Sequence, residues 1–320
     1  QTCALPICDA GKTLTQANDI LTVKGKIADI ANVNINQITL DPQDTQAVYL
    51  ATETNGIIYS LDGGRSWQQF KSLNKGNVKD VKVDPKNKCI IYAIAENKLF
   101  KSVNCGRDFD NVYFHQKPNV VLTAVEIDSY NPKRVFMGTA EGEVLKSSDE
   151  GNSWLAIFRE DAVVDIVIDP YDTRIIYVGT EKKGLFKTID GGDNWQSLGE
   201  GLKSYTGSHQ YRRLIYDTAT RDSLILISKF GMLKTRNGGD SWDIISLLPA
   251  HKTTNILAVA VNPKNSNELY YVTSNSLVKT VDGGLTWSSK QLPYNRQTND
   301  IVINPEKPEI VYFATAFIKK

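Results

Sequence analysis

The sequence predicts an all-β protein, a seven-bladed β-propeller made of four-stranded antiparallel blades. Three observations support this fold: a short phrase that recurs every 41 to 47 residues, a second phrase with the same period, and alternating β-branched runs between the two. Periods of this length are typical of repeat proteins in which each repeat is one supersecondary unit. Length does not decide the matter, since 320 residues fit either two ordinary domains or one large all-β domain.

The first phrase has the pattern Ser/Thr-x-Asp/Asn-x-Gly-x-x-Trp/Phe. Its copies begin at Ser60, Ser102, Ser147, Thr188, Thr235 and Thr280, and all five tryptophans of the chain stand at its last position. The Asp or Asn side chain can accept backbone N–H bonds within its own turn, and the glycine suits a position with positive φ. Near-equivalent copies on different blades cannot all face one site. We therefore interpret them as structural turns rather than as catalytic or calcium-binding groups.

The second phrase is an Asp or Asn, often followed by Pro, that ends a short apolar run. It occurs at Asp41, Asp84, Asp128, Asp169, Asp217, Asn262 and Asn304. Proline cannot continue a central strand, so each copy marks a strand end. In the clearest unit, strands a, b and c are predicted at 164–169, 175–180 and 185–188, and strand d starts at Trp195. Seven such units without helical periodicity predict seven propeller blades.

The two ends of the chain complete each other in this prediction. Residues 310–315 and 317–319 are expected to form strands b and c of the seventh unit, and the segment 9–14 is a worn copy of the first phrase. The N-terminal segment is therefore expected to add strand d to the last blade and close the ring, which removes exposed sheet edges. Residues 1–8 fit no blade position and resemble a translated sequencing adapter. They are set aside as a non-native leader, which leaves 9–320 as a single domain.

The first phrase resembles the Asp box of the BNR repeat. Together with the Asp-Pro turn and the hairpin 175–187, it resembles the sortilin/Vps10-like and photosystem II stability/assembly factor-like seven-bladed propellers over residues 9–320. The resemblance implies an exported bacterial protein that is secreted, periplasmic or lipid-anchored. It specifies the fold but not the function, because this superfamily includes receptors, assembly factors and glycoside hydrolases.

Composition excludes several functions. Lys and Arg total 37 and Asp and Glu total 36, which argues against a nucleic-acid partner bound through bulk charge. No apolar run is long enough to span a membrane. The three histidines lie far apart in the sequence and no cofactor fingerprint is present, so we expect neither a metal site nor a cofactor.

Strand a of each blade is expected to line the central channel. Counting back from its terminal Asp or Asn, positions −1 and −3 are apolar, so position −4 faces the channel. The residues at −4 are Gln37, Asp80, Ala124, Asp165, Arg213, Ala258 and Asp300. Asp80, Asp165 and Asp300 are therefore predicted to line the channel with Arg213. They form either a cation or polar-ligand site or, as the preferred interpretation, the polar wall of a water-filled channel.

Two cysteines are expected to face each other across one hairpin. Cys89 opens strand b of the second blade, Cys105 follows strand c, and the hairpin between them centres near Asn97. A disulfide between Cys89 and Cys105 suits an exported protein, and two free thiols are the alternative.

The connections from strand d to the next strand a differ most among the units, and the longest internal one is 198–210. Variable loops on a rigid frame suit ligand binding, and exposed aromatic and Arg side chains suit interfaces. The candidate binding residues are Tyr205, His209, Tyr211, Arg212, Arg213, His251 and Arg296.

The sequence thus favours a non-catalytic scaffold, not an enzyme, that binds a protein partner or, as a second candidate ligand, a glycan. A glycoside hydrolase-like enzyme is the alternative. Sialidases need an arginine triad that these repeats do not supply. Xyloglucanase-type enzymes pair two propellers around a cleft, whereas one propeller is predicted here.

Overall fold

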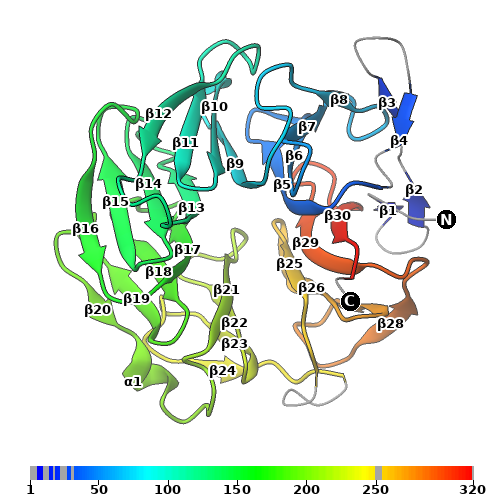
Figure 1. Cartoon of the computed structure of the whole chain (residues 1–320). Coiled ribbons are helices and arrows are strands. Elements are labelled where there is room, and N and C mark those ends of the chain that lie inside the picture. Colours follow the sequence, from blue (N-terminus) through cyan, green and yellow to red (C-terminus); the bar gives the residue numbers. More distant parts are fainter. Residues whose placement is uncertain are drawn as a thin grey trace.

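The computed structural model describes residues 32–248 and 254–318, together with four short strands within the first 29 residues. It is an all-β ring of sheets arranged around a central axis (Figure 1). A single turn of helix, α1 (Gly199–Leu202), lies in the longest of the predicted connections. No helix in the described part of the chain is long and apolar enough to cross a membrane.

Six blades are each built from four consecutive antiparallel strands, a to d from the axis outward. Blades 1 to 3 are β5 (Ile35–Asp41), β6 (Asp44–Thr52), β7 (Ile57–Ser60) and β8 (Gln68–Gln69); β9 (Val78–Asp84), β10 (Asn87–Ala95), β11 (Lys98–Ser102) and β12 (Asp110–Phe114); and β13 (Leu122–Ile127), β14 (Val135–Thr139), β15 (Glu143–Ser147) and β16 (Leu155–Arg159). Blades 4 to 6 are β17 (Val163–Ile168), β18 (Ile176–Thr180), β19 (Gly184–Thr188) and β20 (Gln196–Ser197); β21 (Tyr211–Tyr216), β22 (Leu224–Ser228), β23 (Gly231–Thr235) and β24 (Asp243–Ile244); and β25 (Ala258–Asn262), β26 (Asn265–Val272), β27 (Ser276–Thr280) and β28 (Ser288–Gln291).

The prediction of a seven-bladed propeller is wrong: the described chain has six blades of four consecutive antiparallel strands. The repeat count is larger because the last repeat provides only two strands, β29 (Gln297–Ile303) and β30 (Ile310–Ala316). Residues 317 and 318, predicted to begin a further strand, are not in a sheet.

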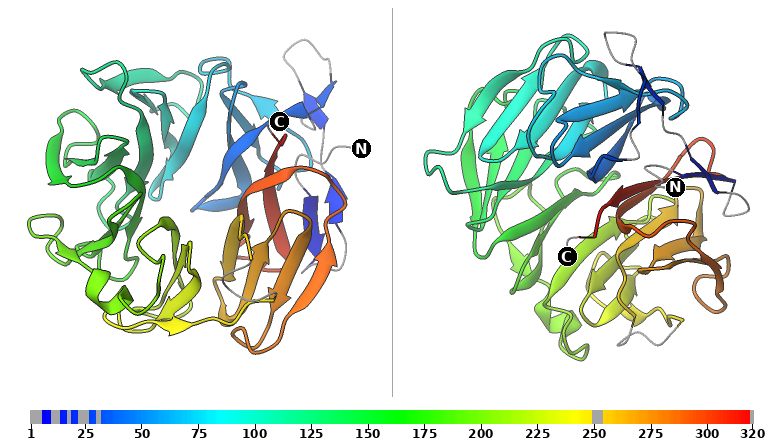
Figure 2. Two further views of the ribbon diagram at one scale, coloured as in Figure 1. Left: turned by 60° about the horizontal axis from the view of Figure 1, so that its bottom comes forward. Right: turned by 45° about the vertical axis from the view of Figure 1, so that its right-hand side comes forward.

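The sheet of β29 and β30 is a composite. Its other two strands are β1 (Pro6–Asp9) and β2 (Leu14–Gln16), and two residue pairs, Cys8 with Val311 and Asp9 with Ile310, join β1 to β30. Figure 2 shows these N-terminal strands in dark blue beside the C-terminal strands in red. The N-terminal segment thus provides two strands rather than the predicted single strand d. β1 also includes part of the segment that the sequence interpretation set aside. A separate pair, β3 (Asp19–Leu21) and β4 (Ile27–Asp29), lies outside the blades.

Within a blade, the strand positions are those that the sequence predicts. In blade 4 the boundaries of β17, β18 and β19 differ from the predicted ones by one residue. The apolar side chains meet between neighbouring blades, as where Tyr92 and Ile94 of blade 2 pack on Val125 and Met137 of blade 3. Each blade therefore stabilises the next by burying one face of its sheet.

The Asp-box turns are held by their own side chains. In blade 1 the Gly64 N–H donates to Ser60 Oγ at 2.8 Å, and the Ser66 N–H donates to Asp62 Oδ1 at 2.8 Å. The glycine at the fifth position of the phrase has positive φ in all six copies that begin between Ser60 and Thr280, as the sequence predicts. These bonds stay inside the turn, which supports the interpretation of the boxes as structural.

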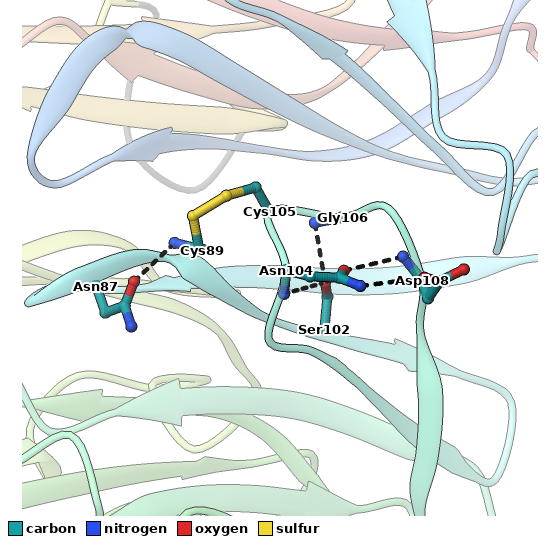
Figure 3. The surroundings of a disulfide bond; sticks show 7 residues. All are labelled: Asn87, Cys89, Ser102, Asn104, Cys105, Gly106 and Asp108. Atoms are coloured by element: carbon teal, nitrogen blue, oxygen red, sulfur yellow. Dashed lines mark hydrogen bonds between the residues drawn. A yellow bond between two sulfur atoms is a disulfide. The ribbon is translucent and has the colours of Figure 1, made fainter.

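Cys89 and Cys105 form a disulfide in blade 2. Figure 3 shows the bond beside the box turn of Ser102, Asn104 and Gly106. Cys105 occupies a box position with φ of 60°, where four of the other five boxes have glycine. The bond ties the end of strand c to the start of strand b.

Candidate functional site

A repeated irregularity in strand a shapes the mouth of the central channel. In β5, β9, β13, β17, β21 and β29 the register with strand b shifts by one residue near the strand start. The residues left without a partner are Asn36, Lys79, Thr123, Val164, Arg212 and Asn299. A bulge adds one residue to a strand and re-aims its neighbours.

These bulges create a pocket of 180 Å³ at the channel mouth. Five consecutive blades each contribute the bulged residue and the residue after it, which is the predicted channel position −4. The lining residues are Asn36, Gln37, Lys79, Asp80, Thr123, Ala124, Val164, Asp165, Arg212 and Arg213. All of them are near the start of strand a, so the mouth opens on the face of the d-to-a and b-to-c connections.

Two of the predicted channel aspartates join neighbouring sheets. The Val125 N–H of blade 3 donates to Asp80 Oδ2 at 3.0 Å, and the Ile38 N–H of blade 1 donates to Asp300 Oδ2 at 3.2 Å. In both cases the acceptor is at position −4 of one sheet and the donor at −3 of the next. A carboxylate at this position therefore accepts a hydrogen bond from a buried backbone N–H of the next sheet.

Asp80 is the most unusual group at the mouth. Its side chain is 6% exposed, and Oδ1 has no hydrogen-bond partner among the described residues. Burial raises the pKa of Asp80 to about 6, against the opposing effect of the nearby Lys82. Two further buried oxygens of the same pocket, Gln37 Oε1 and Thr123 Oγ1, also lack a partner among the described residues.

The other predicted channel residues are paired. Arg213 Nη1 lies 2.6 Å from Asp300 Oδ1, and the attraction of Asp300 raises the pKa of Arg213. The Tyr211 hydroxyl donates to Asp165 Oδ2 at 3.0 Å. Tyr211 is 6% exposed, so the prediction that it is an exposed interface residue is wrong. Its ring fills the space above Gly179, where a Cβ would lie 2.0 Å from it.

The remaining predicted binding residues do not form one site. Arg296 is 1% exposed and its Nη2 donates to the Val33 carbonyl at 2.8 Å, so it joins the composite sheet to the start of blade 1 instead of facing solvent. Tyr205 is half-buried and its hydroxyl donates to the Trp242 carbonyl, while His209 is exposed. His251 lies outside the described residues.

A second pocket, of 500 Å³, opens on the same face between blades 2 and 3. We call it the surface groove. Its residues come from the end of β12, the following connection, the β14–β15 hairpin and the end of β16. They are Tyr113, Phe114, His115, Gln116, Lys117, Glu141, Glu143, Arg159 and Glu160. Phe114 is 61% exposed, so its aromatic ring is accessible to solvent in the groove.

Ion pairs order the floor of the surface groove. Arg159 Nε donates to Glu143 Oε1 at 2.9 Å, and His115 Nε2 lies 3.6 Å from Glu143 Oε2. The hydrogen bond from Arg159, together with His115, lowers the pKa of Glu143, which is therefore ionised at neutral pH. Glu141 pairs with Lys117 at 2.6 Å and Glu160 pairs with Lys183 at 2.7 Å. The groove thus offers fixed donors and acceptors with little net charge.

The sequence interpretation missed most of the surface groove, although His115 and Lys117 fall in a variable connection. The signal for Glu143 would have been its place at the start of a strand c, beside a d-to-a connection.

Within the described residues, no group of three His, Cys, Asp or Glu side chains is arranged to hold a metal ion.

Comparisons with known proteins bear on these two pockets. No model of a known protein family matches the sequence. A xyloglucanase of Hypocrea jecorina (strain QM6a) is 30% identical over a region that covers 41% of this chain and 21% of the xyloglucanase. The chain therefore spans about a fifth of that curated relative.

Two solved structures have the same fold. The GH74 xyloglucanase of Xanthomonas campestris superposes with a TM-score of 0.71 and 18% identity, over 89% of this chain and 51% of that one. YCF48 bound to D1 peptide superposes with a TM-score of 0.68 and 15% identity, over 89% of this chain and 94% of that one. At these identities the likeness establishes a β-propeller and nothing finer.

These comparisons correct the functional interpretation of the sequence. The xyloglucanase relative and the xyloglucanase structure support the glycoside hydrolase alternative better than a non-catalytic scaffold, so the expectation that the chain is not an enzyme is overturned. The Asp boxes could not reveal this, because they are structural turns and say nothing about the chemistry on the opposite face.

Proposed function

We propose that this chain is a glycoside hydrolase-like propeller that binds a β-linked glucan of the xyloglucan type and takes part in its hydrolysis. The observation that carries the proposal is the 30% identity to a xyloglucanase, supported by the shared fold of a xyloglucanase structure. Because the chain covers about half of that structure and less of the curated relative, the activity and substrate of those proteins are a proposal here.

The surface groove has the chemistry that a neutral polysaccharide needs. An exposed aromatic ring such as Phe114 can cover the apolar face of a sugar ring, and fixed carboxylate and guanidinium groups can bind its hydroxyls. Its volume of 500 Å³ is within the usual range for ligand sites. Because its charged side chains form ion pairs, the groove avoids the repulsion that would arise if all of its charges had the same sign.

Glycoside hydrolysis uses two carboxyl groups, one protonated and one ionised. Glu143, which Arg159 and His115 keep ionised, suits the role of base or charge-stabilising carboxylate. Glu141 and Glu160, each paired with one exposed lysine, are the two further carboxyl groups of the groove. An extracytoplasmic location is part of this proposal, since such polysaccharides are extracellular and the Cys89–Cys105 disulfide suits an oxidising compartment.

The test is to incubate the intact protein with xyloglucan and to measure reducing ends, together with retardation in gels that contain the polysaccharide. Phe114→Ala should weaken retardation about tenfold, and Glu143→Gln should lower hydrolysis at least a hundredfold while leaving retardation nearly unchanged. Tyr130→Ala is the matched control, because Tyr130 is an exposed aromatic residue (76%) in an a-to-b turn on the opposite face. If the wild-type protein neither releases reducing ends nor is retarded, the proposal is wrong.

A further inference from the structure

We infer that the channel mouth is a binding site for one small neutral polyhydroxyl molecule, of the size of a single sugar ring. This site is distinct from the surface groove and does not rest on the proposed hydrolysis. It uses the buried oxygens of Asp80, Gln37 and Thr123 and the cationic side chains at the rim of the same 180 Å³ pocket.

The first argument is the unmet hydrogen-bonding capacity of the wall. Asp80 is only 6% exposed, yet its Oδ1 has no partner among the described residues, and the same holds for Gln37 Oε1 and Thr123 Oγ1. Buried polar atoms are normally hydrogen-bonded, and each one without a partner carries a desolvation penalty. Asp80 Oδ1 and Gln37 Oε1 accept hydrogen bonds, and Thr123 Oγ1 can accept or donate one, so the molecule that satisfies them must carry at least two donors.

The second argument is charge, which disfavours an ion of either sign. Lys79, Arg212 and Arg213 line the pocket and disfavour a cation, while Asp80 and Asp165 in the same wall disfavour an anion. The buried Asp300, bound to Arg213, brings the local balance to three positive and three negative groups. A neutral molecule therefore has the lowest electrostatic free-energy cost of entering this pocket.

The third argument is the kind and size of ligand. A hydroxyl group both donates and accepts, so a polyhydroxyl molecule can donate to the wall oxygens and accept from the rim cations at the same time. Arg213 remains about one-third exposed beside its partner Asp300, and Arg212 is exposed at the bulge. A cavity of about 150 Å³ is known to hold a six-membered ring, so this pocket has room for one pyranose ring.

The experiment is isothermal titration and ligand-observed NMR of the intact protein with D-glucose, D-xylose and myo-inositol, each up to 50 mM. We expect saturable binding of at least one of them with a millimolar Kd. Asp80→Asn and Thr123→Val should each weaken that binding at least fivefold. Asp110→Asn, the same chemical change on the exposed strand β12, should leave the Kd unchanged.

Each of the following results would overturn the inference: no saturable binding of any of these molecules, binding that the Asp80 and Thr123 variants do not change, or preferential binding of methylammonium or Ca²⁺ in parallel titrations. Circular dichroism of each variant ensures that a loss of binding reflects the site and not unfolding.

Phe114→Ala, which changes the surface groove, separates the two sites. Monosaccharide binding that persists in this variant supports the channel site even if xyloglucan is not hydrolysed, and binding that is lost with Phe114 contradicts it.

Discussion

Arg213 reaches past a whole blade to bind Asp300. The two residues belong to blade 5 and to the composite sheet, and Nη1 and Oδ1 lie 2.6 Å apart. Blade 6 lies between them, and its residue at the same channel position is Ala258, whose side chain is too short to block the path. One small residue thus allows the longest side chain of the channel wall to neutralise a carboxylate that is 1% exposed.

This contact makes Arg213 important for stability. Arg213→Met should lower the free energy of unfolding by about 2–3 kcal/mol, because it leaves the Asp300 carboxylate buried without its partner. Asp300→Asn in the same chain should restore part of the loss, since the amide still accepts the Ile38 N–H. Urea unfolding of the four members of this cycle measures the coupling. Additive effects would show that the ion pair contributes nothing.

Asp80 should make stability depend on pH between about 4 and 6. Burial raises its folded-state pKa to about 6 from an ordinary value of 3.8, so the folded protein binds the extra proton more tightly than the unfolded chain. Stability therefore falls as pH rises through this window and levels off above it. The shift of about two pKa units corresponds to a loss of about 3 kcal/mol.

The check is urea unfolding at intervals from pH 4 to pH 8, for the wild type and for Asp80→Asn. The variant should lack this slope and should be the more stable of the two above pH 7. Lys82, Glu126 and Asp165 act on Asp80 and are common to both proteins, so the difference between the curves isolates its titration. Parallel curves would contradict the prediction.

The disulfide should stabilise blade 2. Cys89 and Cys105 are 16 residues apart, and closing a loop of this length contributes about 3 kcal/mol in the chain-entropy model. Cys89→Ser should cost about 2–3 kcal/mol. Adding Cys105→Gly should recover about 1 kcal/mol, because Cys105 has a φ of 60° that glycine adopts without strain. Thermal unfolding of both variants tests this, after alkylation and intact mass have shown that the wild-type cysteines are bonded.

Gly179 should be needed to seat Tyr211. A methyl group at Gly179 would lie 2.0 Å from the Tyr211 ring, so Gly179→Ala should displace the ring and break its bond to Asp165, at a cost of about 2 kcal/mol. In a Tyr211→Leu background the same change should cost much less. Denaturant midpoints of the single and double variants decide the point, and equal costs in both backgrounds would refute the steric explanation.

The repeat pattern determined most of this fold. The Asp-Pro phrase and the Asp box mark the two strand ends that face away from the channel mouth, which is why strands 163–168, 176–180 and 184–188 could be located within one residue. Period-2 alternation likewise predicted that Asp80 and Asp165 face the channel, because side chains of a strand alternate between its two faces. The predicted protein partner remains a prediction.

Only the tertiary structure decided the blade count, the bulges and the pairings. A seventh copy of a phrase shows that a strand ends there, but not that four consecutive strands assemble into a blade, and the last repeat provides only β29 and β30. The bulges that place Lys79 and Thr123 at the channel mouth depend on pairing with strand b, which has no local sequence signal. Arg213 and Asp300 are 87 residues apart, and the burial of Tyr211 depends on the missing side chain of Gly179 in the neighbouring blade. Such contacts arise only when the blades close around the axis, because each depends on the space that another blade leaves free.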